Sequence, residues 1–237
     1  MALRQTAPGP PDRPAAVARR RRPITYPETD PRIMPDTPAH FDALIRLLLI
    51  LRAWFAARPD VFVGGDMMFY WVAGDPKQAL APDLFVAFGV RRDAPRRVWK
   101  TWEEAVPAVV VEITSRKTRT RDTERKYRLY EDLGVAEYFL FDPLGEYLRP
   151  PLRGYRLTTA GGYAPLAADG RGWLASETLG LWLAAGAGHV RLFDGAVAEL
   201  LSPQERVAEA EARAEAAERQ LRALQHRPPD HTNGAVE

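Results

Sequence analysis

Residues 108–141, AVVVEITSRKTRTRDTERKYRLYEDLGVAEYFLF, decide the fold, because two apolar runs here enclose a helical segment. Residues 108–113 are mostly β-branched, which is typical of a central strand covered on both faces. Residues 122–133 have the apolar spacing of a helix that stops at Gly134, and residues 137–141 form a second apolar strand. A strand, a crossover helix and a strand predict a right-handed βαβ unit with parallel strands. The chain is therefore expected to be an α/β protein with a mixed sheet.

Further elements are expected on both sides of this unit. Thr37 and Pro38 have the residue types of a helix N-cap and first helical position, and apolar residues then recur at helical spacing to about Ala57. The pattern predicts short strands at residues 61–63, 67–72 and 83–88 before the βαβ unit. Shorter strands are predicted after it, at residues 146–148, 155–157 and 190–193. Together these elements make one globular domain over residues 37–202.

The two ends of the chain differ from this domain in composition. Residues 1–36 contain eight prolines and few apolar residues, so we expect a disordered Pro/Arg-rich arm. Residues 203–226 are rich in Ala, Glu and Arg and predict a coiled-coil-like helix, followed by a disordered tail over residues 227–237. An apolar seam of three heptads runs along the helix. It fits a helix that pairs in a homodimer and a solvated helix that packs on its own domain equally well. Its members are Val207, Ala210, Ala214, Ala217, Leu221 and Leu224.

Composition excludes several kinds of site. The chain has no cysteine, which excludes disulfides, thiolate zinc sites and thiol nucleophiles and fits a reducing cytoplasm. Only four histidines are present, which argues against a His-rich metal cluster. The most apolar stretch, residues 47–51, is far shorter than the roughly 20 residues of a membrane-spanning helix. We therefore expect a cytoplasmic protein without a membrane partner.

Two acidic residues stand out on the predicted strands. Asp83 follows Pro82 and opens an apolar strand, whereas Glu112 lies inside the β-branched run. An ionised carboxylate in such a run is costly unless it meets a cation. If the two strands are antiparallel neighbours, both acids lie at one end of the sheet and offer oxygen ligands for Mg²⁺ or Mn²⁺. The alternative is a surface turn with an aspartate and a strand end with a solvated glutamate.

The predicted crossover helix carries a lysine on its buried side. Asp122, Lys126 and Tyr130 fall on one face, together with the leucines that must pack on the sheet. A lysine in this position needs an anionic partner, which the two acids or a bound phosphate would provide. The alternative is a lysine whose stem packs on the sheet while its ammonium reaches water.

Basic charge is concentrated in two segments. Residues 91–100 contain five basic residues and one acidic residue, and residues 116–128 contain seven basic and two acidic ones. We expect these segments to flank the two acids and to contact the phosphates of DNA, although charge on a solvated helix is the alternative. The expected phosphate contacts are Arg91, Arg92, Arg96, Arg97, Lys100, Arg116, Lys117, Arg119 and Arg121.

An ordered set of motifs resembles a known family. The set begins with GDMMFYW at residues 65–71 and Pro82-Asp83, continues with EITS at residues 112–115 and the D-x-x-x-K-x-x-x-Y of residues 122–130, and ends with EYFLFDP at residues 137–143. These motifs resemble the Uma-two family of restriction-endonuclease-like proteins, within the PD-(D/E)XK nuclease superfamily. The resemblance covers roughly residues 37–200.

The resemblance implies a restriction-endonuclease-like core and a Mg²⁺-dependent DNA endonuclease. Asp83 and Glu112 match the metal ligands, whereas Thr114 occupies the place of the superfamily's lysine. The family's helix lysine maps to Lys126, and Lys117 is a second candidate. Asp66, Asp122 and Tyr130 are expected as auxiliary residues. A catalytically silent nucleic-acid-binding module that dimerises through the C-terminal helix is the alternative function.

Overall fold

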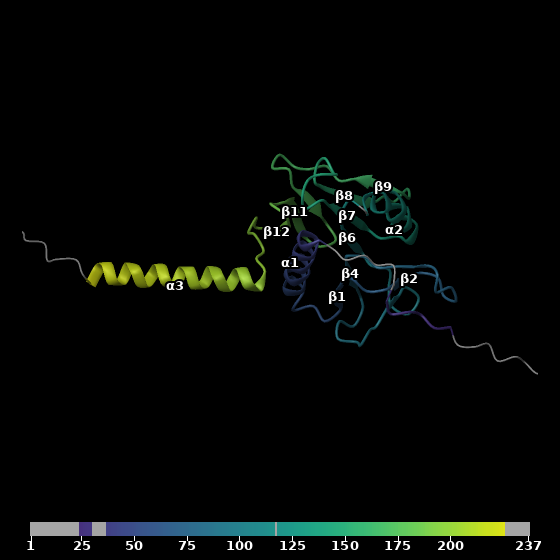
Figure 1. Ribbon diagram of the computed structural model, residues 1–237, viewed down its shortest axis with the longest axis horizontal. Helices are drawn as coiled ribbons and strands as arrows, with labels where there is room; N and C mark the ends of the chain where they lie inside the picture. The colour runs from purple at the N-terminus through teal and green to yellow at the C-terminus, as the bar shows by residue number, and fades with distance from the viewer. Residues whose placement is uncertain (1–23, 30–36, 117, 226–237) are drawn as a thin grey trace, which may run out of the picture.

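A mixed six-stranded sheet forms the centre of the molecule (Figure 1). The computed structural model describes residues 24–29, 37–116 and 118–225. The strand order of the sheet is β1-β4-β6-β7-β8-β9. The strands are β1 (Val61–Gly64), β4 (Leu84–Phe88), β6 (Val109–Ile113), β7 (Glu137–Phe141), β8 (Leu152–Leu157) and β9 (Tyr163–Pro165).

The predicted βαβ unit is present at the centre of this sheet. β6 and β7 are parallel neighbours, with Val109 opposite Glu137 and Ile113 opposite Phe141. The connection differs from the expected uniform α-helix. It contains a π-helix, η1 (Arg121–Lys126), which continues as the α-helix α2 (Tyr127–Leu133). Gly134 ends α2 in the left-handed conformation, with φ of 81°.

Alternation along the strands divides the core into two layers. Leu84, Val109 and Val111 face one side of the sheet, where they pack in one cluster with residues of α1 (Pro38–Trp54). Phe85 and Val110 face the other side and pack with residues of α2. Because side chains alternate along a strand, Glu112 is directed to the same side as Val110. This parity places Glu112 against η1 and α2.

Two small sheets cover the faces of the large one. The sheet β10-β11-β12 packs on the α1 side, and the sheet β3-β2-β5 contributes to the α2 side. Their strands are β2 (Phe69–Tyr70), β3 (Ala79–Leu80), β5 (Trp99–Lys100), β10 (Leu174–Ser176), β11 (Leu181–Ala185) and β12 (Val190–Phe193).

Some of the expected strands are shorter or missing. The strand expected over residues 67–72 is only the two-residue β2. Residues 146–148 form no strand, so this prediction is wrong. The physical reason is Asp142, whose carboxylate accepts hydrogen bonds from the backbone N–H groups of Leu144 (3.2 Å) and Leu148 (2.9 Å). Those bonds hold the segment in a compact loop.

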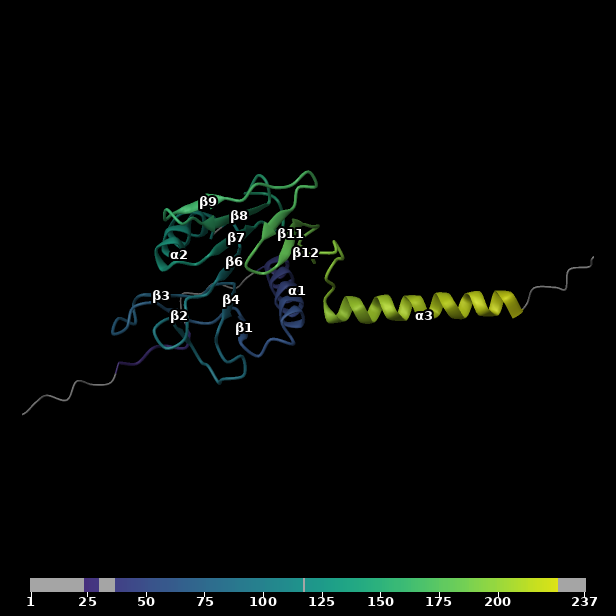
Figure 2. The same ribbon diagram turned by 180° about the vertical axis from the view of Figure 1, so that it is seen from behind.

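Both ends of the described chain lie on the surface. Within the expected disordered arm, residues 24–29 contact the domain: the Tyr26 ring lies 5.0 Å from the Tyr70 ring, and its hydroxyl accepts a 2.7 Å bond from the Gly74 N–H. The rest of residues 1–36 and the tail beyond residue 225 lie outside the described part. At the other end, α3 (Pro203–Gln225) projects from the body (Figures 1 and 2). No helix in the described ranges is long and apolar enough to cross a membrane.

Candidate functional site

Asp83 and Glu112 meet at one end of the central sheet. β4 and β6 are antiparallel, and the pairing of Leu84 with Val111 places Asp83 beside Glu112. The Asp83 backbone N–H lies 3.4 Å from Glu112 Oε2. Asp83 Oδ2 accepts a 2.7 Å bond from the Ile113 N–H, so the aspartate is fixed to the end of β6.

The turn after β1 closes over Asp83. A Cβ added to Gly65 would lie 2.1 Å from the Asp83 carbonyl oxygen, so only glycine allows this close approach. The next residue, Asp66, donates its N–H to the Pro82 carbonyl at 3.0 Å. Asp66 is therefore held next to the residue that precedes Asp83, but it lies in a turn and its side chain is exposed.

Glu112 is enclosed by groups from the crossover connection. Lys126 Nζ lies 2.7 Å from Glu112 Oε2, and the Tyr130 hydroxyl donates a 2.7 Å bond to Glu112 Oε1. Lys126 Nζ also lies 3.4 Å from Asp122 Oδ1. The exposed fraction is 0% for Glu112 and 2% for Lys126. The lysine does not reach water; it lies between two buried acids.

The cluster contains more acidic than basic groups. Burial raises the pKa of the Glu112 carboxyl well above its usual value; the Lys126 ammonium opposes this rise, and Asp83 and Asp122 add to it. Burial likewise raises the pKa of Asp122. At Asp83, burial acts in the same direction, but the hydrogen bond from His40 and the charge of Lys126 outweigh it and lower the pKa. The raised pKa values of Glu112 and Asp122 thus reflect buried carboxyl groups gathered at one end of the sheet.

His40 also belongs to this cluster, although it is not among the site residues predicted from the sequence. Its Nε2 lies 3.2 Å from Asp83 Oδ2, and its side chain is buried near the start of α1. The sequence does contain a pattern that could have identified it. At helical spacing, His40 lies on the same face as Leu44, Leu47 and Leu51. A histidine that begins a buried apolar stripe needs a polar partner from another element.

Thr114 provides a test of whether a metal fits here. Its Oγ1 is buried and has no hydrogen-bond partner in the described part of the chain. Such an atom normally bonds to an ordered water or an ion.

Across the described residues, no group of three or more His, Cys, Asp or Glu could hold a metal. Mg²⁺ nevertheless needs only one or two carboxylates, because it keeps several of its waters. Asp83 and Glu112 fit this requirement.

The second basic segment adjoins the two acids. Residues 116–121 follow directly from the end of β6 at which Glu112 lies, and Arg116, Arg119 and Arg121 are exposed there. Lys117 falls outside the described residues. Three exposed arginines therefore lie on the segment that follows the strand end carrying Glu112.

The beginning of the first basic segment lies away from the two acids. Arg91 and Arg92 follow the opposite end of β4, beside the start of β1. The register therefore does not bring residues 91 and 92 next to the acids. Arg96 is 5% exposed and pairs with Glu104 at 2.7 Å, whereas Arg97, at 82% exposed, lies 3.0 Å from Glu28. Lys100 pairs with Glu103 at 3.0 Å.

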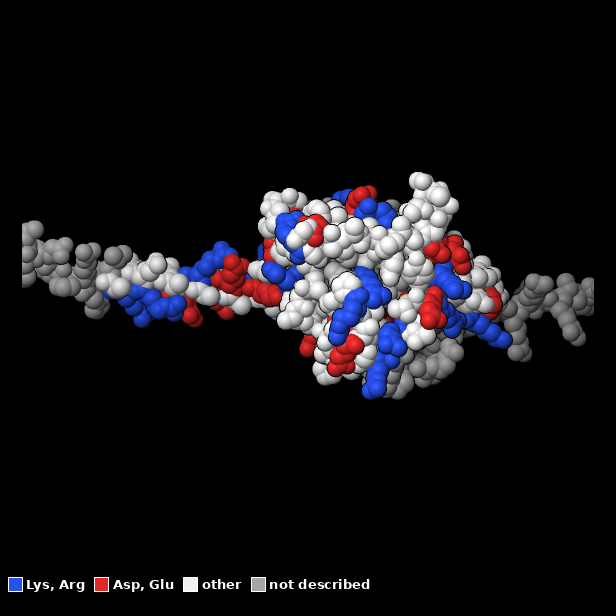
Figure 3. Space-filling view, turned by 90° about the horizontal axis from the view of Figure 1, so that it is seen from above, with Lys and Arg blue, Asp and Glu red and all other residues white. Residues whose placement is uncertain are grey.

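The surface shows the same mixture of charges. In Figure 3, blue and red side chains lie beside one another across the face shown, without a broad region of one sign. Any nucleic-acid contact on this face must therefore come from individual exposed arginines rather than from a continuous basic surface.

Comparisons with known proteins agree with the motifs. The model of the Uma2 family, described as "Putative restriction endonuclease", matches residues 18–186. A crystal structure from Anabaena variabilis ATCC 29413, described as "a putative nuclease belonging to DUF820", is 12% identical, with a TM-score of 0.45. That match covers 62% of this chain and 76% of the other. The search of curated proteins found no match.

Proposed function

The chain belongs to the Uma2 family, and we propose that it is a metal-dependent endonuclease that hydrolyses phosphodiester bonds in DNA. The observation that carries the proposal is the buried cluster at the start of β4 and the end of β6, where Asp83, Glu112 and Lys126 meet. Three acids surround one ammonium there, and the pKa of Glu112 is raised. This arrangement suits a divalent cation beside a positively charged side chain.

Asp83 and Glu112 would hold the Mg²⁺ or Mn²⁺ ion. Each carboxylate oxygen can accept more than one bond, so the contacts to Tyr130 and Lys126 leave Glu112 able to ligate. When bound, the ion would polarise a phosphoryl oxygen and lower the pKa of a water. His40 and the Ile113 N–H orient the Asp83 carboxylate for this task.

Lys126 supplies the fixed positive charge. Its ammonium is held between Glu112 and Asp122. In this proposal it would stabilise the negative charge that develops on a phosphate during hydrolysis. The exposed Arg116, Arg119 and Arg121 would contact flanking phosphates and provide affinity without sequence information. From the first segment, the exposed Arg91 and Arg97 are the stronger candidates for such contacts, because Arg96 is buried against Glu104.

Nicking of supercoiled plasmid DNA by the full-length chain tests the proposal. We expect nicking with Mg²⁺ or Mn²⁺ and none with a chelator, and we expect Asp83→Asn and Glu112→Gln to abolish it. Asp93→Asn is the matched control, because the Asp93 side chain is 86% exposed and lies outside the cluster. If Asp83→Asn cuts as fast as the parent chain, the assignment of the metal ligands is wrong.

A catalytically silent nucleic-acid-binding module is the second candidate, and the closure of the cluster favours it. Glu112 and Lys126 are both buried and bonded to each other, so a phosphate reaches them only if neighbouring side chains move. For this candidate we expect DNA binding that weakens steeply with salt and no cleavage with any divalent metal. Cleavage that needs Asp83 would exclude it.

A further inference from the structure

The helix α3 is exposed over most of residues 203–223. It projects from the body in both views, and between residues 206 and 223 only Ala216 is partly buried (Figures 1 and 2). Its 23 residues correspond to a rod of about 35 Å. Val207 and Leu221 are each 57% exposed on it. Because α3 covers no part of the core of its domain, packing within the domain does not account for its apolar side chains.

Those apolar residues form a single seam. They recur in alternating steps of three and four residues, which are the a and d positions of a left-handed coiled coil. Val207, Ala214 and Leu221 take the a positions, and Ala210, Ala217 and Leu224 take the d positions.

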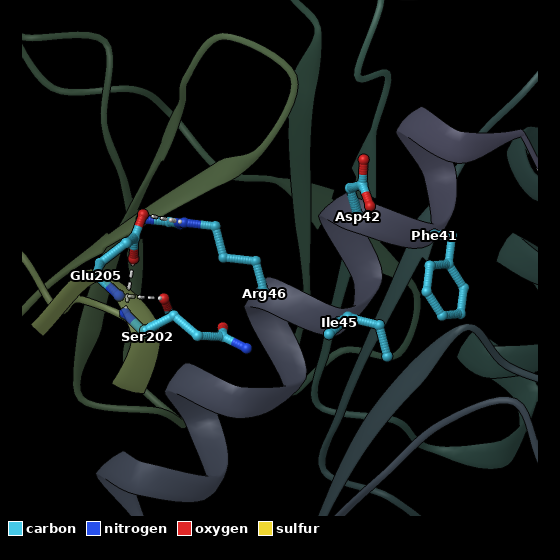
Figure 4. Close-up of a pocket in the computed structure, with 7 residues that line it drawn as sticks. Phe41, Asp42, Ile45, Arg46, Ser202 and Glu205 are labelled. Carbon is cyan, nitrogen blue, oxygen red and sulfur yellow. Dashed lines mark hydrogen bonds and ion pairs between the residues drawn. The ribbon is translucent and has the colours of Figure 1, made fainter. Parts of the chain in front are cut away.

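The base of α3 turns this seam away from the chain's own domain. Glu205 accepts a 2.9 Å bond from Arg46 of α1, and it forms a capping box with Ser202 (Figure 4). Successive residues of an α-helix are rotated by about 100°, so Val207 lies about 200° from Glu205. The helix is therefore attached by one side and presents the seam on the opposite side.

The charges beside the seam select the partner. Arg206 and Arg213 occupy g positions, and Glu211 and Glu218 occupy e positions. In a parallel dimer in register, each g residue faces the e residue five positions later in the other helix, so each arginine meets a glutamate. In an antiparallel dimer, g faces g and e faces e, so like charges meet. The pattern is complementary to itself only in the parallel arrangement.

We infer that α3 pairs with α3 of a second copy of this chain as a parallel, in-register coiled coil. Because each helix is attached at its first turn, the two globular domains then lie at the same end of the coil. The alanines at half of the seam positions bury little surface, so the dimer is weak and depends on concentration. The inference uses only the contacts and charges of α3 and does not depend on the proposed function.

Disulfide trapping tests the orientation, because the chain has no cysteine of its own. We expect Ala210→Cys to form a disulfide-linked dimer of the full-length chain under mild oxidation, since the two d positions face each other. The matched control is Ala212→Cys, an equally exposed alanine of α3 at the outward f position. Equal trapping by the two variants, or trapping by neither, would overturn the inference.

Charge reversal tests the partner. We expect Glu211→Arg/Glu218→Arg and Arg206→Glu/Arg213→Glu each to be monomeric at concentrations where the parent chain is dimeric by sedimentation velocity. An equimolar mixture of the two variants should recover dimers, because opposite charges again face each other. These residues are exposed, and circular dichroism checks that α3 remains helical. A parent chain that stays monomeric at every concentration, or dimers retained by either variant, would contradict the inference.

Discussion

Lys126 illustrates what a single buried charge does in this protein. Its ammonium lies 2.7 Å from Glu112 and 3.4 Å from Asp122, and all three side chains are buried. A buried ion pair adds little net stability, but removal of one partner leaves an uncompensated charge. The lysine is therefore needed for stability as well as for any role in chemistry, and the two roles must be measured separately.

We expect Lys126→Met to lower the free energy of unfolding by about 3–5 kcal/mol at neutral pH. Urea denaturation measures this loss, and Glu112→Gln/Lys126→Met is the control, because it removes both charges and should recover part of the stability. Burial raises the pKa of Glu112, so the folded state binds its proton more tightly than the unfolded state does. The deficit of Lys126→Met should therefore shrink as the pH falls. A deficit that does not change with pH would contradict this account.

If the proposed chemistry holds, Lys126→Met should also lower turnover by roughly 10²–10³-fold, because it removes a charge that acts in the transition state. Lys117→Met should have little effect if the helix lysine is the catalytic one. Plasmid nicking under conditions where both variants remain folded measures the difference. If the Lys117 variant fails and the Lys126 variant cuts at the parent rate, the roles are reversed.

His40 contacts the candidate site through Asp83. We expect His40→Ala to weaken Mn²⁺ binding by about 10–100-fold, as is typical when a group that orients a metal ligand is removed. Isothermal titration calorimetry measures the affinity, with His189→Ala as the control, since that residue lies in the turn between β11 and β12. Equal affinity in the parent chain and the His40 variant would show that the contact with Asp83 is only structural.

At the scale of elements, three backbone segments converge on the acids. The start of β4 carries Asp83, the end of β6 carries Glu112, and the turn after β1 covers Asp83 through Gly65. The connection η1–α2 then closes the cluster from one side of the sheet, with Lys126 at the junction of its π-helical and α-helical parts. π-Helical turns are rare and often occur at functional sites.

We expect Gly65→Ala to displace Asp83, because the new Cβ would lie 2.1 Å from the Asp83 carbonyl oxygen. The stability should fall by about 1–3 kcal/mol, as is typical of overpacking, and Mn²⁺ affinity should fall with it. Gly195→Ala is the control, because a Cβ at that position meets nothing within 4 Å. Thermal unfolding measures the stability and calorimetry measures the Mn²⁺ affinity. Equal values of both for the two variants would contradict the prediction.

The whole molecule is a globular domain with one projecting helix. The core clusters end with the strands and loops that precede α3, which contributes no residue to either of them. Its attachment to the body includes the Arg46–Glu205 ion pair and the capping box at Ser202. We therefore expect the domain and the helix to be separable parts.

We expect deletion of residues 203–237 to leave the domain folded. The loss of one partly exposed ion pair should lower the free energy of unfolding by at most about 1 kcal/mol. The truncated chain should also be monomeric at all concentrations. Circular dichroism with urea denaturation, and sedimentation velocity, measure these two outcomes. If truncation unfolds the domain, α3 is part of its core.

The local sequence pattern was sufficient to predict the main helices and strands of the fold. The β-branched run at residues 109–113, the stop at Gly134 and the Thr37 cap each depend on neighbouring residues, and each is present in the structure. Residues 146–148 were predicted as a strand but form a loop, because the Asp142 carboxylate accepts hydrogen bonds from backbone N–H groups there. Every residue except proline has such a group, so the sequence pattern does not reveal these bonds.

The candidate site shows the same division. A carboxylate in an apolar strand and a lysine on a buried helical stripe were recognisable as costly from sequence alone, because burial follows from periodicity. Periodicity does not say which element from elsewhere in the chain completes a cluster. Only the tertiary structure brings His40, 43 residues before Asp83, to its carboxylate, and only strand register places Arg91 and Arg92 at the opposite end of β4. Sequence determined which residues need partners, and long-range packing decided which partners they have.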